Sequence, residues 1–461
     1  MTQQFDAIVI GTGQAGPSLA HRLSDAGMSV AVIERHRFGG TCVNTGCIPT
    51  KTLIASAYVA YMTRRARDYG VGISGQVTVD MRAVKARKDE MSERSRSSVE
   101  RAMRGLKNAA VFTGTGRFED SRTVRVNDHV LRADRIFINV GGRANVPPFP
   151  GIDRTPFLTN SGMMEVDFLP AHLVIVGGSY VGIEFAQMFR RFGSEVTIVE
   201  KDSRLVSRED EDVSGAIGEI LEQEGIRIRL NATCITARQS QRGIAVGVEC
   251  AEGAPEVEGS HLLLAVGRKP NTDDLGLDRA GVDTDERGYI RVDDQCRTNV
   301  PGIWALGDCN GRGAFTHTAY NDFEIVAANL LDKDRRGISD RVPCYALYTD
   351  PPLGRIGMTE SQVRKSGRRA LIGKLSMSSV KRAQERGESR GFMKVLVAED
   401  TREILGAALL GLNCDEVVHS LLDVMYAHAP STVVQRAMHI HPTVSEYLPT
   451  IMGALQPLGA N

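Results

Sequence analysis

One pattern occurs twice in this chain and constrains its fold more than any other feature. An apolar strand leads into a glycine-rich turn, which is followed by an amphipathic helix, a second apolar strand and a glutamate. Period-two and helical apolar spacings of this kind predict a strand–turn–helix–strand unit. The residues are Gly11, Gly13, Gly16 and Glu34 in the first copy, and Gly177, Gly178, Gly182 and Glu200 in the second.

The spacing within each copy predicts a dinucleotide-binding unit. In both copies, 23 positions separate the first glycine from the glutamate. The turn brings backbone amides and a helix N-terminus to a pyrophosphate, and the carboxylate accepts hydrogen bonds from ribose hydroxyls. Two such units in one chain suit a hydride relay between two dinucleotides. Ser179 replaces the middle glycine of the second turn, which crowds the pyrophosphate there but adds a hydroxyl donor.

Length and strand–glycine boundaries predict the domain organisation. The 461 residues suffice for three or four domains. Apolar strands that end at Gly141 and Gly267 mark where the chain leaves one nucleotide unit for the next. We expect a first nucleotide-binding part at 1–149, a second nucleotide-binding domain at 150–270, a return segment of the first at 271–342, and a separate α+β domain at 343–461.

Composition excludes several classes of function. Lys and Arg together number 56, as do Asp and Glu, which argues against a nucleic-acid or polybasic membrane partner. No apolar run reaches the roughly 18 residues of a membrane helix. The first residues lead directly into a strand and lack the basic start and apolar stretch of a signal peptide. A cytoplasmic location is therefore expected.

Two of the eight cysteines differ from the rest. Eight are too few for a disulfide framework in a chain of this length, and the isolated ones are expected to be small buried side chains. Cys42 and Cys47 lie close together in the segment 39–51. No second cysteine pair or nearby histidine completes a zinc site, so we predict no metal site. Pro49 favours a helix start after Cys47, and a helix N-terminus stabilises a thiolate.

The whole chain resembles the pyridine nucleotide–disulfide oxidoreductases, the flavoenzyme family of dihydrolipoamide dehydrogenase, glutathione reductase and mercuric reductase. Five motifs carry the resemblance in family order: the two glycine turns, the Cys42–Cys47 segment through Lys51, Gly307-Asp308, and the segment 441–446. The resemblance implies an α/β fold with two Rossmann-like domains, for FAD and NAD(P), and a C-terminal α+β dimerisation domain.

The resemblance also implies which residues bind the cofactors. Those expected at FAD are Gly11, Gly13, Gly16, Glu34, Thr41, Lys51, Gly116, Gly141 and Asp308. Those expected at NAD(P) are Gly177, Gly178, Tyr180, Gly182, Glu200 and Gly267. Tyr180 matches an aromatic residue that covers the flavin until nicotinamide displaces it. NADH is preferred over NADPH, because a 2′-phosphate would meet the Glu200 carboxylate, although Lys201 and Arg204 lie near enough to blunt this choice.

The implied catalytic residues are the cysteine pair, Lys51 with Glu184, and His441 with Glu446. Cys47 is assigned to the flavin and Cys42 to exchange with substrate. Thiol exchange needs a base, and imidazole has a suitable pKa that a carboxylate partner raises. Family members take this histidine and glutamate from the opposite subunit, so the active enzyme is expected to be a homodimer. An ordinary surface ion pair is the alternative interpretation of Lys51 and Glu184.

The electron acceptor stays open. The cysteine segment and the stretch 439–446 are most similar to mercuric-reductase-like members, which implies a disulfide or metal-ion acceptor. However, the tail 455–461 lacks the vicinal cysteines typical of those enzymes. Dihydrolipoamide dehydrogenase is the first alternative. A quinone or Cu(II) reductase acting directly from the flavin is the second, and a flavin-bound sensor protein is the third.

Overall fold

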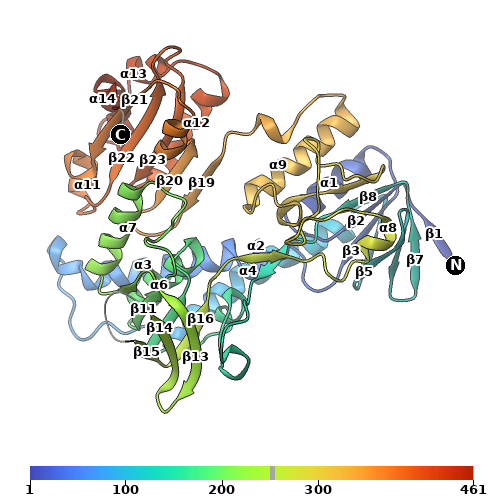
Figure 1. Ribbon diagram of the computed structural model, residues 1–461, viewed down its shortest axis with the longest axis horizontal. Coiled ribbons are helices and arrows are strands. Elements are labelled where there is room, and N and C mark those ends of the chain that lie inside the picture. The colour runs from blue at the N-terminus through green and yellow to red at the C-terminus, as the bar shows by residue number, and fades with distance from the viewer. Residues whose placement is uncertain (250–254, 460–461) are drawn as a thin grey trace.

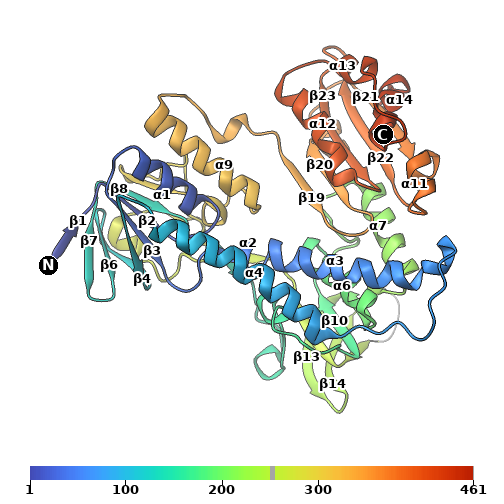
Figure 2. The same cartoon turned by 180° about the vertical axis from the view of Figure 1, so that it is seen from behind.

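The computed structural model describes residues 1–249 and 255–459, with the side chain of Cys234 left out (Figure 1). Cys250 lies outside the described residues. Three bodies are visible along the chain: an N-terminal one that carries α1 and α9, a middle one that carries α6 and α7, and a C-terminal one drawn in red (Figures 1 and 2).

The first body is built on a parallel sheet covered on both faces. Its order is β18–β8–β2–β3–β4. The strands are Ile303–Ala305, Arg135–Ile138, Ala7–Ile10, Val30–Glu34 and Ala109–Thr113. Val9 packs against helices α1 (Ala15–Asp25) and α9 (Thr316–Ala327), whereas Ile8 and Ile10 face the opposite way. Burial on both faces explains why β2 reads as an unbroken apolar run.

A small sheet covers that opposite face. Its order is β1–β7–β6–β5. The strands are Thr2–Gln4, His129–Arg132, Thr123–Val126 and Gly116–Asp120. Phe118 and Val124 join Ile8 and Ile10 in one core cluster. The resulting layers are helices, parallel sheet and small sheet. Helices α2 (Gly40–Asn44), α3 (Cys47–Arg64) and α4 (Met81–Arg104) then extend toward the middle body (Figure 2).

The second body repeats this layering. Its parallel sheet has the order β12–β11–β10–β16. The strands are Arg227–Arg229, Glu195–Val199, His172–Val176 and His261–Leu264. Leu173 and Ile175 pack with helix α6 (Tyr180–Phe192) and α7 (Glu211–Gln223), while Val174 and Val176 face the antiparallel sheet β13–β14–β15. The members of that sheet are Thr233–Ser240, Gly243–Glu249 and Glu256–Gly259.

Two short strands join the nucleotide-binding bodies. β9 (Gly142–Ala144) and β17 (Arg268–Pro270) pair antiparallel, with Arg268 opposite Ala144. β9 follows β8, and β17 follows the edge strand β16, so the chain passes between the bodies at the carboxyl edges of both sheets. Ligand crevices form at these edges in parallel sheets.

The C-terminal body is a six-stranded antiparallel sheet with helices against it. Its order is β19–β20–β23–β22–β21–β24. The strands are Cys344–Leu347, Leu353–Gly357, Ile404–Leu410, Phe392–Ala398, Ala370–Ser376 and Gln456–Pro457. The helices are α10 (Glu360–Lys365), α11 (Lys381–Glu385), α12 (Cys414–Tyr426), α13 (Thr432–Arg436) and α14 (Leu448–Gly453). The predicted fold class is confirmed: two Rossmann-like units and an α+β body.

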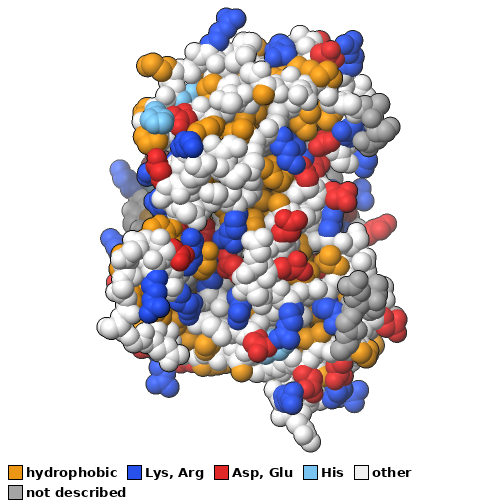
Figure 3. Space-filling model, turned by 90° about the vertical axis from the view of Figure 1, so that its left-hand side faces the viewer, with side chains coloured by type: hydrophobic (Ala, Val, Ile, Leu, Met, Phe, Trp, Pro, Cys, Tyr) orange, Lys and Arg blue, Asp and Glu red, His pale blue; other side chains and the backbone are white. Residues whose placement is uncertain are grey.

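Short elements complete the fold. They are α5 (Asn160–Met163), α8 (Leu277–Ala280), and the single turns Ala66–Tyr69, Ile152–Arg154, Gly307–Asn310, Ala328–Asp332, Ile338–Asp340, Met377–Ser379 and Ser445–Tyr447. Among the described residues, no helix is both long and apolar enough to cross a membrane. Lys and Arg side chains are interspersed with Asp and Glu on the face shown in Figure 3.

Candidate active site

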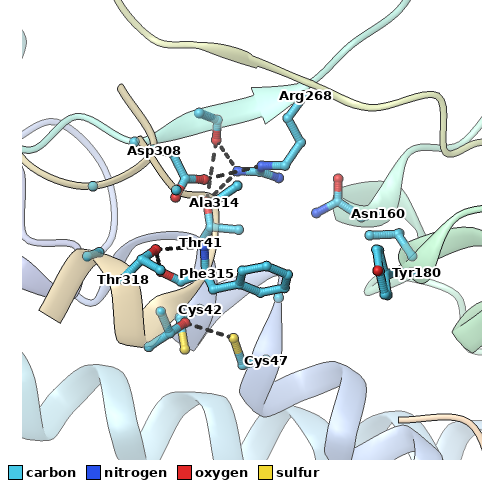
Figure 4. A pocket seen from close by; sticks show the side chains of 18 of the residues that line it. Thr41, Cys42, Cys47, Asn160, Tyr180, Arg268, Asp308, Ala314, Phe315 and Thr318 are labelled. Atoms are coloured by element: carbon cyan, nitrogen blue, oxygen red, sulfur yellow. Dashed lines mark hydrogen bonds and ion pairs between the residues drawn. The ribbon is translucent and has the colours of Figure 1, made fainter. Parts of the chain in front are cut away.

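A single large cavity brings both glycine turns and the cysteine pair together. Its volume is about 2740 Å³, far above the roughly 300–1,000 Å³ of an ordinary small-ligand pocket. All three bodies contribute to its lining. In Figure 4, Phe315 lies between the cysteine pair and the Arg268–Asp308 pair, with Asn160 and Tyr180 across the pocket.

The first glycine turn is packed tightly against its own strand and the strand beside it. A Cβ at Gly16 would lie 2.2 Å from the Gly11 carbonyl oxygen, and one at Gly11, where φ is +102°, would lie 2.3 Å from the Asn139 carbonyl oxygen. Gly13 has more space, because the nearest atom to its Cβ would be Asn139 Oδ1 at 3.1 Å. Gly11 and Gly16 therefore serve packing, whereas Gly13 presents bare backbone to the cavity.

Glu34 ends the second strand of this unit with its carboxylate held by the turn. Its Oε2 accepts hydrogen bonds from the Thr12 amide at 3.1 Å and the Thr12 hydroxyl at 2.6 Å. Its Oε1 accepts one from the His36 amide at 2.9 Å. The carboxylate therefore lies beside the glycine turn, in the position that a ribose-binding acid occupies.

Asp308 and Arg268 form an ion pair on the far side of the same cavity. Asp308 lies in the turn Gly307–Asn310, and its Oδ2 is 3.4 Å from Arg268 Nε. Burial raises the pKa of Asp308, and the Arg268 charge opposes that rise. Arg268 also donates to the Gly142 carbonyl at 2.5 Å and to the Thr41 hydroxyl at 3.4 Å. Gly116 and Gly141 line the same region.

The cysteine pair lies on two consecutive short segments. Cys42 is in α2 and half-buried, and Cys47 is the first residue of α3 and exposed to the cavity. Both thiols are free in this structure. Cys47 Sγ lies 3.1 Å from the Thr316 hydroxyl at the start of α9. The Cys47 sulfur therefore lies beside the first residues of two helices, α3 and α9, and helix N-termini favour negative charge.

The two thiols differ strongly in acidity. The pKa of Cys47 is lowered to about 6, first by a hydrogen bond from Cys42, then by Thr316 and by the Lys51 charge, against the opposing effect of burial. The pKa of Cys42 is raised, because it shares that hydrogen bond and is itself buried. In the reduced pair, Cys47 is therefore the thiolate and Cys42 the thiol.

Lys51 connects the cysteine helix to the second nucleotide unit. It lies on α3, one turn after Cys47, and its Nζ donates to both Glu184 oxygens at 3.0 and 2.8 Å. The Glu184 side chain on α6 is buried and also accepts the Tyr348 amide at 3.0 Å. Lys51 Nζ lies 4.5 Å from the Tyr348 ring centroid, a cation–π contact. A buried carboxylate partner distinguishes this pair from an ordinary surface ion pair.

The second glycine turn repeats the geometry of the first. A Cβ at Gly182 would lie 1.9 Å from the Gly177 carbonyl oxygen. Glu200 Oε2 accepts the Gly178 amide at 2.6 Å, and its Oε1 accepts the Asp202 amide at 2.9 Å. Gly267 also lines the cavity, and a Cβ there would meet open space.

The predicted base pair is formed, but it lies away from the cysteines. His441 Nδ1 is 2.8 Å from Glu446 Oε2, and the His441 side chain is 74% exposed. Neither residue lines the cavity that holds Cys42 and Cys47. Within one chain, the structure therefore does not bring His441 to the thiols.

Sequence reasoning missed three residues that organise this site. Asn139 is buried, accepts the Gly16 amide at 2.9 Å and donates to the Leu306 carbonyl at 2.9 Å. Arg268 contacts Asp308, as described above, and Thr316 contacts Cys47. Each acts through a partner far away in sequence. For Arg268 and Asn139, the one sequence signal is their position close to the strand-ending glycines Gly267 and Gly141. Thr316 has no such signal.

The donor set fits two dinucleotides and a dithiol. Each glycine turn offers free backbone, a helix N-terminus and a strand-ending carboxylate, and Asp308 adds an acid to the first unit. These features define a nucleotide-dependent dithiol oxidoreductase. The chain belongs to the pyridine nucleotide–disulphide oxidoreductase family: residues 5–322 match the family and residues 344–452 match its dimerisation domain. The family consists of FAD-binding enzymes that use a pyridine nucleotide.

Three relatives are similar over nearly their whole length. The chain is 37% identical to the probable pyridine nucleotide–disulfide oxidoreductase RclA of Escherichia coli, covering 96% of this chain and 98% of the relative. It is 32% identical to dihydrolipoyl dehydrogenase of Chlamydia pneumoniae, covering 97% and 96%. It is also 32% identical to mercuric reductase of Streptomyces lividans, covering 96% and 94%.

Solved structures agree with these relationships. The HOCl-induced flavoprotein disulfide reductase RclA from Escherichia coli superposes with a TM-score of 0.88 at 35% identity, covering 97% of this chain and 99% of that one. The Cu(II) complex of the same protein gives a TM-score of 0.89 at 35% identity, covering 98% and 99%. The expected family, fold and FAD-dependent enzyme class are thus confirmed.

Proposed function

We propose that this enzyme uses NADH to reduce a thiophilic metal ion, Cu(II), through FAD and the Cys42–Cys47 pair. One observation carries the proposal: the Cys42 and Cys47 thiols lie side by side in the cavity, and no metal-binding group of described His, Cys, Asp or Glu residues includes them. Among residues with described side chains, no group of three or more His, Cys, Asp or Glu could hold a metal ion. Two sulfurs suit Cu(I), which prefers thiolate ligands, and an incomplete set favours its release. The complex of the RclA relative with Cu(II) also supports copper as the acceptor.

The proposed reaction balances with two metal ions per nucleotide. Oxidation of the Cys42 thiol together with the Cys47 thiolate forms one S–S bond and releases two electrons and one proton. Each Cu(II) accepts one electron and leaves as Cu(I). The net reaction is NADH + 2 Cu(II) → NAD⁺ + H⁺ + 2 Cu(I). FAD, when bound, would supply the hydride-accepting chemistry that links NADH to the disulfide.

The residues of the cavity take the roles that the sequence predicts. Gly13, Glu34, Thr41, Lys51, Gly116, Gly141 and Asp308 would hold FAD, and the tightly packed Gly11 and Gly16 would shape the turn that binds it. Gly177, Gly178, Tyr180, Glu200 and Gly267 would hold the nicotinamide nucleotide, and Gly182 would shape the second turn. Cys47 would be the thiolate on the flavin side, and Lys51 is oriented by its hydrogen bonds to Glu184. Arg268 and Thr316 join this set on the strength of their contacts with Asp308 and Cys47.

NADH is the proposed nucleotide, with NADPH as a poorer substrate. Glu200 lies at the turn with its carboxylate between two backbone amides, so a 2′-phosphate would meet like charge. The kcat/KM ratio for NADH over NADPH should fall at least about tenfold in Glu200→Ala. An unchanged ratio would remove Glu200 from nucleotide selection.

Reduction of a disulfide such as lipoamide is the second candidate, favoured by the His441–Glu446 hydrogen bond. A thiol–disulfide exchange needs that base, whereas electron transfer to a metal ion does not. We propose that His441 acts on the Cys42–Cys47 pair of the other subunit in a cytoplasmic homodimer. The match to a dimerisation domain and the distance of His441 from its own cavity support this arrangement.

One variant separates the two candidate acceptors. Wild type and His441→Gln are assayed for NADH oxidation with Cu(II) and with lipoamide, and His439→Gln serves as the matched control. We expect Cu(II) reduction in wild type, with two Cu(I) formed per NADH, and no more than about a twofold change in His441→Gln. Turnover with lipoamide but not Cu(II), lost in His441→Gln alone, would make the disulfide the acceptor.

A further inference from the structure

Two tyrosine hydroxyls from different bodies of the chain meet on one buried carboxylate beside the cavity. Tyr180 is the first residue of α6, and Tyr345 lies in β19. Their hydroxyls donate to the same atom, Glu209 Oε1, at 3.0 and 2.6 Å. The Glu209 side chain is 0% exposed. Both tyrosines line the cavity that holds the cysteine pair and the second glycine turn.

Arg355 supplies the positive charge opposite Glu209, but it lies nearest to Oε2 and leaves Oε1 to the two tyrosine hydroxyls. Its side chain is 2% exposed, and its Nε lies 3.8 Å from Glu209 Oε2 and its Nη1 3.9 Å from Asp210. Within the described part of the chain, no residue accepts a hydrogen bond from Arg355 Nε, Nη1 or Nη2, and none donates to Glu209 Oε2. A buried carboxylate is costly unless it is hydrogen-bonded. Tyr180 and Tyr345 provide those hydrogen bonds.

Both hydroxyls remain donors at neutral pH. Burial, followed by the Glu209 charge, raises the pKa of Tyr180 and raises that of Tyr345 to about 12. Neither phenol ionises in the range where the enzyme would work. The two bonds to Glu209 Oε1 are therefore charge-assisted, a class that is stronger than neutral hydrogen bonds.

The two rings differ in how firmly they are held. Tyr345 stacks on Phe315 with centroids 5.4 Å apart and planes at 10°. Tyr180 meets Phe315 and Tyr345 only edge to face, with centroids 6.4 and 5.6 Å apart, although both tyrosines are half-buried. Tyr345 is thus fixed by stacking, whereas the hydroxyl bond to Glu209 is the polar contact that fixes Tyr180.

We propose that Glu209 is a positioning residue that latches Tyr180 over the nicotinamide end of the cavity, and that Tyr345 weakens this latch by sharing the same oxygen. The inference rests on the proposed function, in which nicotinamide enters where Tyr180 lies. Nicotinamide binding then requires the Tyr180 hydroxyl to leave Glu209. The strength of this bond sets part of the affinity for the nicotinamide half of the nucleotide.

The latch predicts effects of opposite sign for two isosteric substitutions. Tyr180→Phe removes the bond, so NAD⁺ should bind about tenfold more tightly. Tyr345→Phe leaves Tyr180 as the only donor to Oε1, so NAD⁺ should bind about threefold more weakly. Glu209→Gln removes the charge and should act like Tyr180→Phe. Adding Glu209→Gln to Tyr180→Phe should then have no further effect.

Calorimetric titration of the FAD-loaded enzyme with NAD⁺ and with ADP-ribose tests the latch. ADP-ribose keeps the adenine, pyrophosphate and both riboses but has no nicotinamide, so its Kd should stay constant in all variants. The ratio of the two Kd values therefore reports only the nicotinamide end. Tyr58→Phe is the matched control, because Tyr58 donates to Glu388 at 2.6 Å outside the cavity and should leave the ratio unchanged.

The Tyr180 and Tyr345 variants decide the outcome even if Glu209→Gln fails to fold. Opposite shifts of the ratio support the latch. Shifts of the same sign, or a constant ratio in both variants, overturn it while leaving the proposed reaction intact. A wild type that binds neither NAD⁺ nor ADP-ribose overturns the proposed nucleotide site together with the latch.

Discussion

Three neighbouring residues, Cys42, Thr316 and Lys51, lower the pKa of Cys47. The reactivity of this thiol should therefore depend on pH in a measurable way. Because the pKa is lowered to about 6, the thiolate is present above that pH and is lost as the pH falls through it. Alkylation of the reduced enzyme by iodoacetamide, followed by mass spectrometry, should show a Cys47 rate with a midpoint near pH 6. Only thiolate reacts at a useful rate.

The neighbours of Cys47 should lower its pKa by different amounts, in a defined order. Cys42→Ala removes the largest cause and should raise the midpoint more than Thr316→Val does. Thr52→Val is the control, because Thr52 donates to the Ile48 carbonyl within the same helix at 2.8 Å. A midpoint above pH 8 in wild type, or one that Cys42→Ala leaves in place, would contradict the assigned thiolate.

For single residues, the sequence predicts those site residues that lie close together in one short segment. Cys42, Cys47 and Lys51 lie within one turn and one helix start, so their proximity follows from local geometry. Thr316 is 269 positions from Cys47 and carries no motif of its own. Such a contact depends on how the return segment docks, which no local pattern encodes.

At the scale of the element, the glycines of the first turn divide into packing and ligand positions. A Cβ at Gly16 would strike a backbone oxygen that cannot move, so Gly16→Ala should prevent stable folding, with or without added FAD. A Cβ at Gly13 would touch only the end of the Asn139 side chain. Gly13→Ala should therefore fold and lose most FAD affinity.

Thermal melting and flavin content of the purified variants separate the two effects. The second unit provides a matched pair, since Gly182 is as tightly packed as Gly16. Gly182→Ala should unfold and leave no nucleotide-binding protein to assay. A stable Gly16→Ala protein with normal FAD content would contradict the division.

Element type was predictable because apolar periodicity is local. β2, β3, β10 and β11 are buried along almost their entire length and consist mainly of apolar residues, with Thr197 as the buried polar residue within β11. Helix ends depend on single residues: the basic helix α4 ends at Arg104, with Gly105 directly after it. In the described residues after 343, the helical part of the expected α+β domain is divided among five helices, of which α12 is the longest with 13 residues.

For the whole molecule, the C-terminal segment that carries His441 predicts a dimer. Met438 and Ile440 are 99% and 80% exposed in the single chain. Burying each such side chain contributes roughly 1.5–3 kcal/mol. Met438→Glu with Ile440→Glu should therefore shift the enzyme from dimer to monomer in analytical ultracentrifugation.

The matched control is Phe168→Glu, which changes an exposed apolar residue of the second nucleotide unit. That variant should sediment as the wild type does. A wild type that is monomeric at micromolar concentration, or a double variant that stays dimeric, would contradict the proposed role of this segment.

The repeated strand–turn–helix–strand pattern was enough to predict that the molecule contains two nucleotide-binding units. The two glycine units and the antiparallel C-terminal body follow from pattern and from the family resemblance. Domain limits at 149, 270 and 342 remain predictions. The Tyr180–Glu209–Tyr345 contact was not predictable, because it joins bodies whose relative placement depends on packing between domains.

The central claim is that electrons reach Cu(II) through the cysteine pair rather than directly from the flavin. Its most direct test is NADH oxidation with Cu(II), with Cu(I) captured by a chelator, in wild type and in Cys42→Ala that retains full FAD. The control is Cys344→Ala, since Cys344 also lines the cavity. We expect a loss of at least about a hundredfold in Cys42→Ala, equivalent to roughly 2.7 kcal/mol, and none in Cys344→Ala. A Cys42→Ala enzyme that reduces Cu(II) at the wild-type rate would contradict it and make the flavin itself the donor.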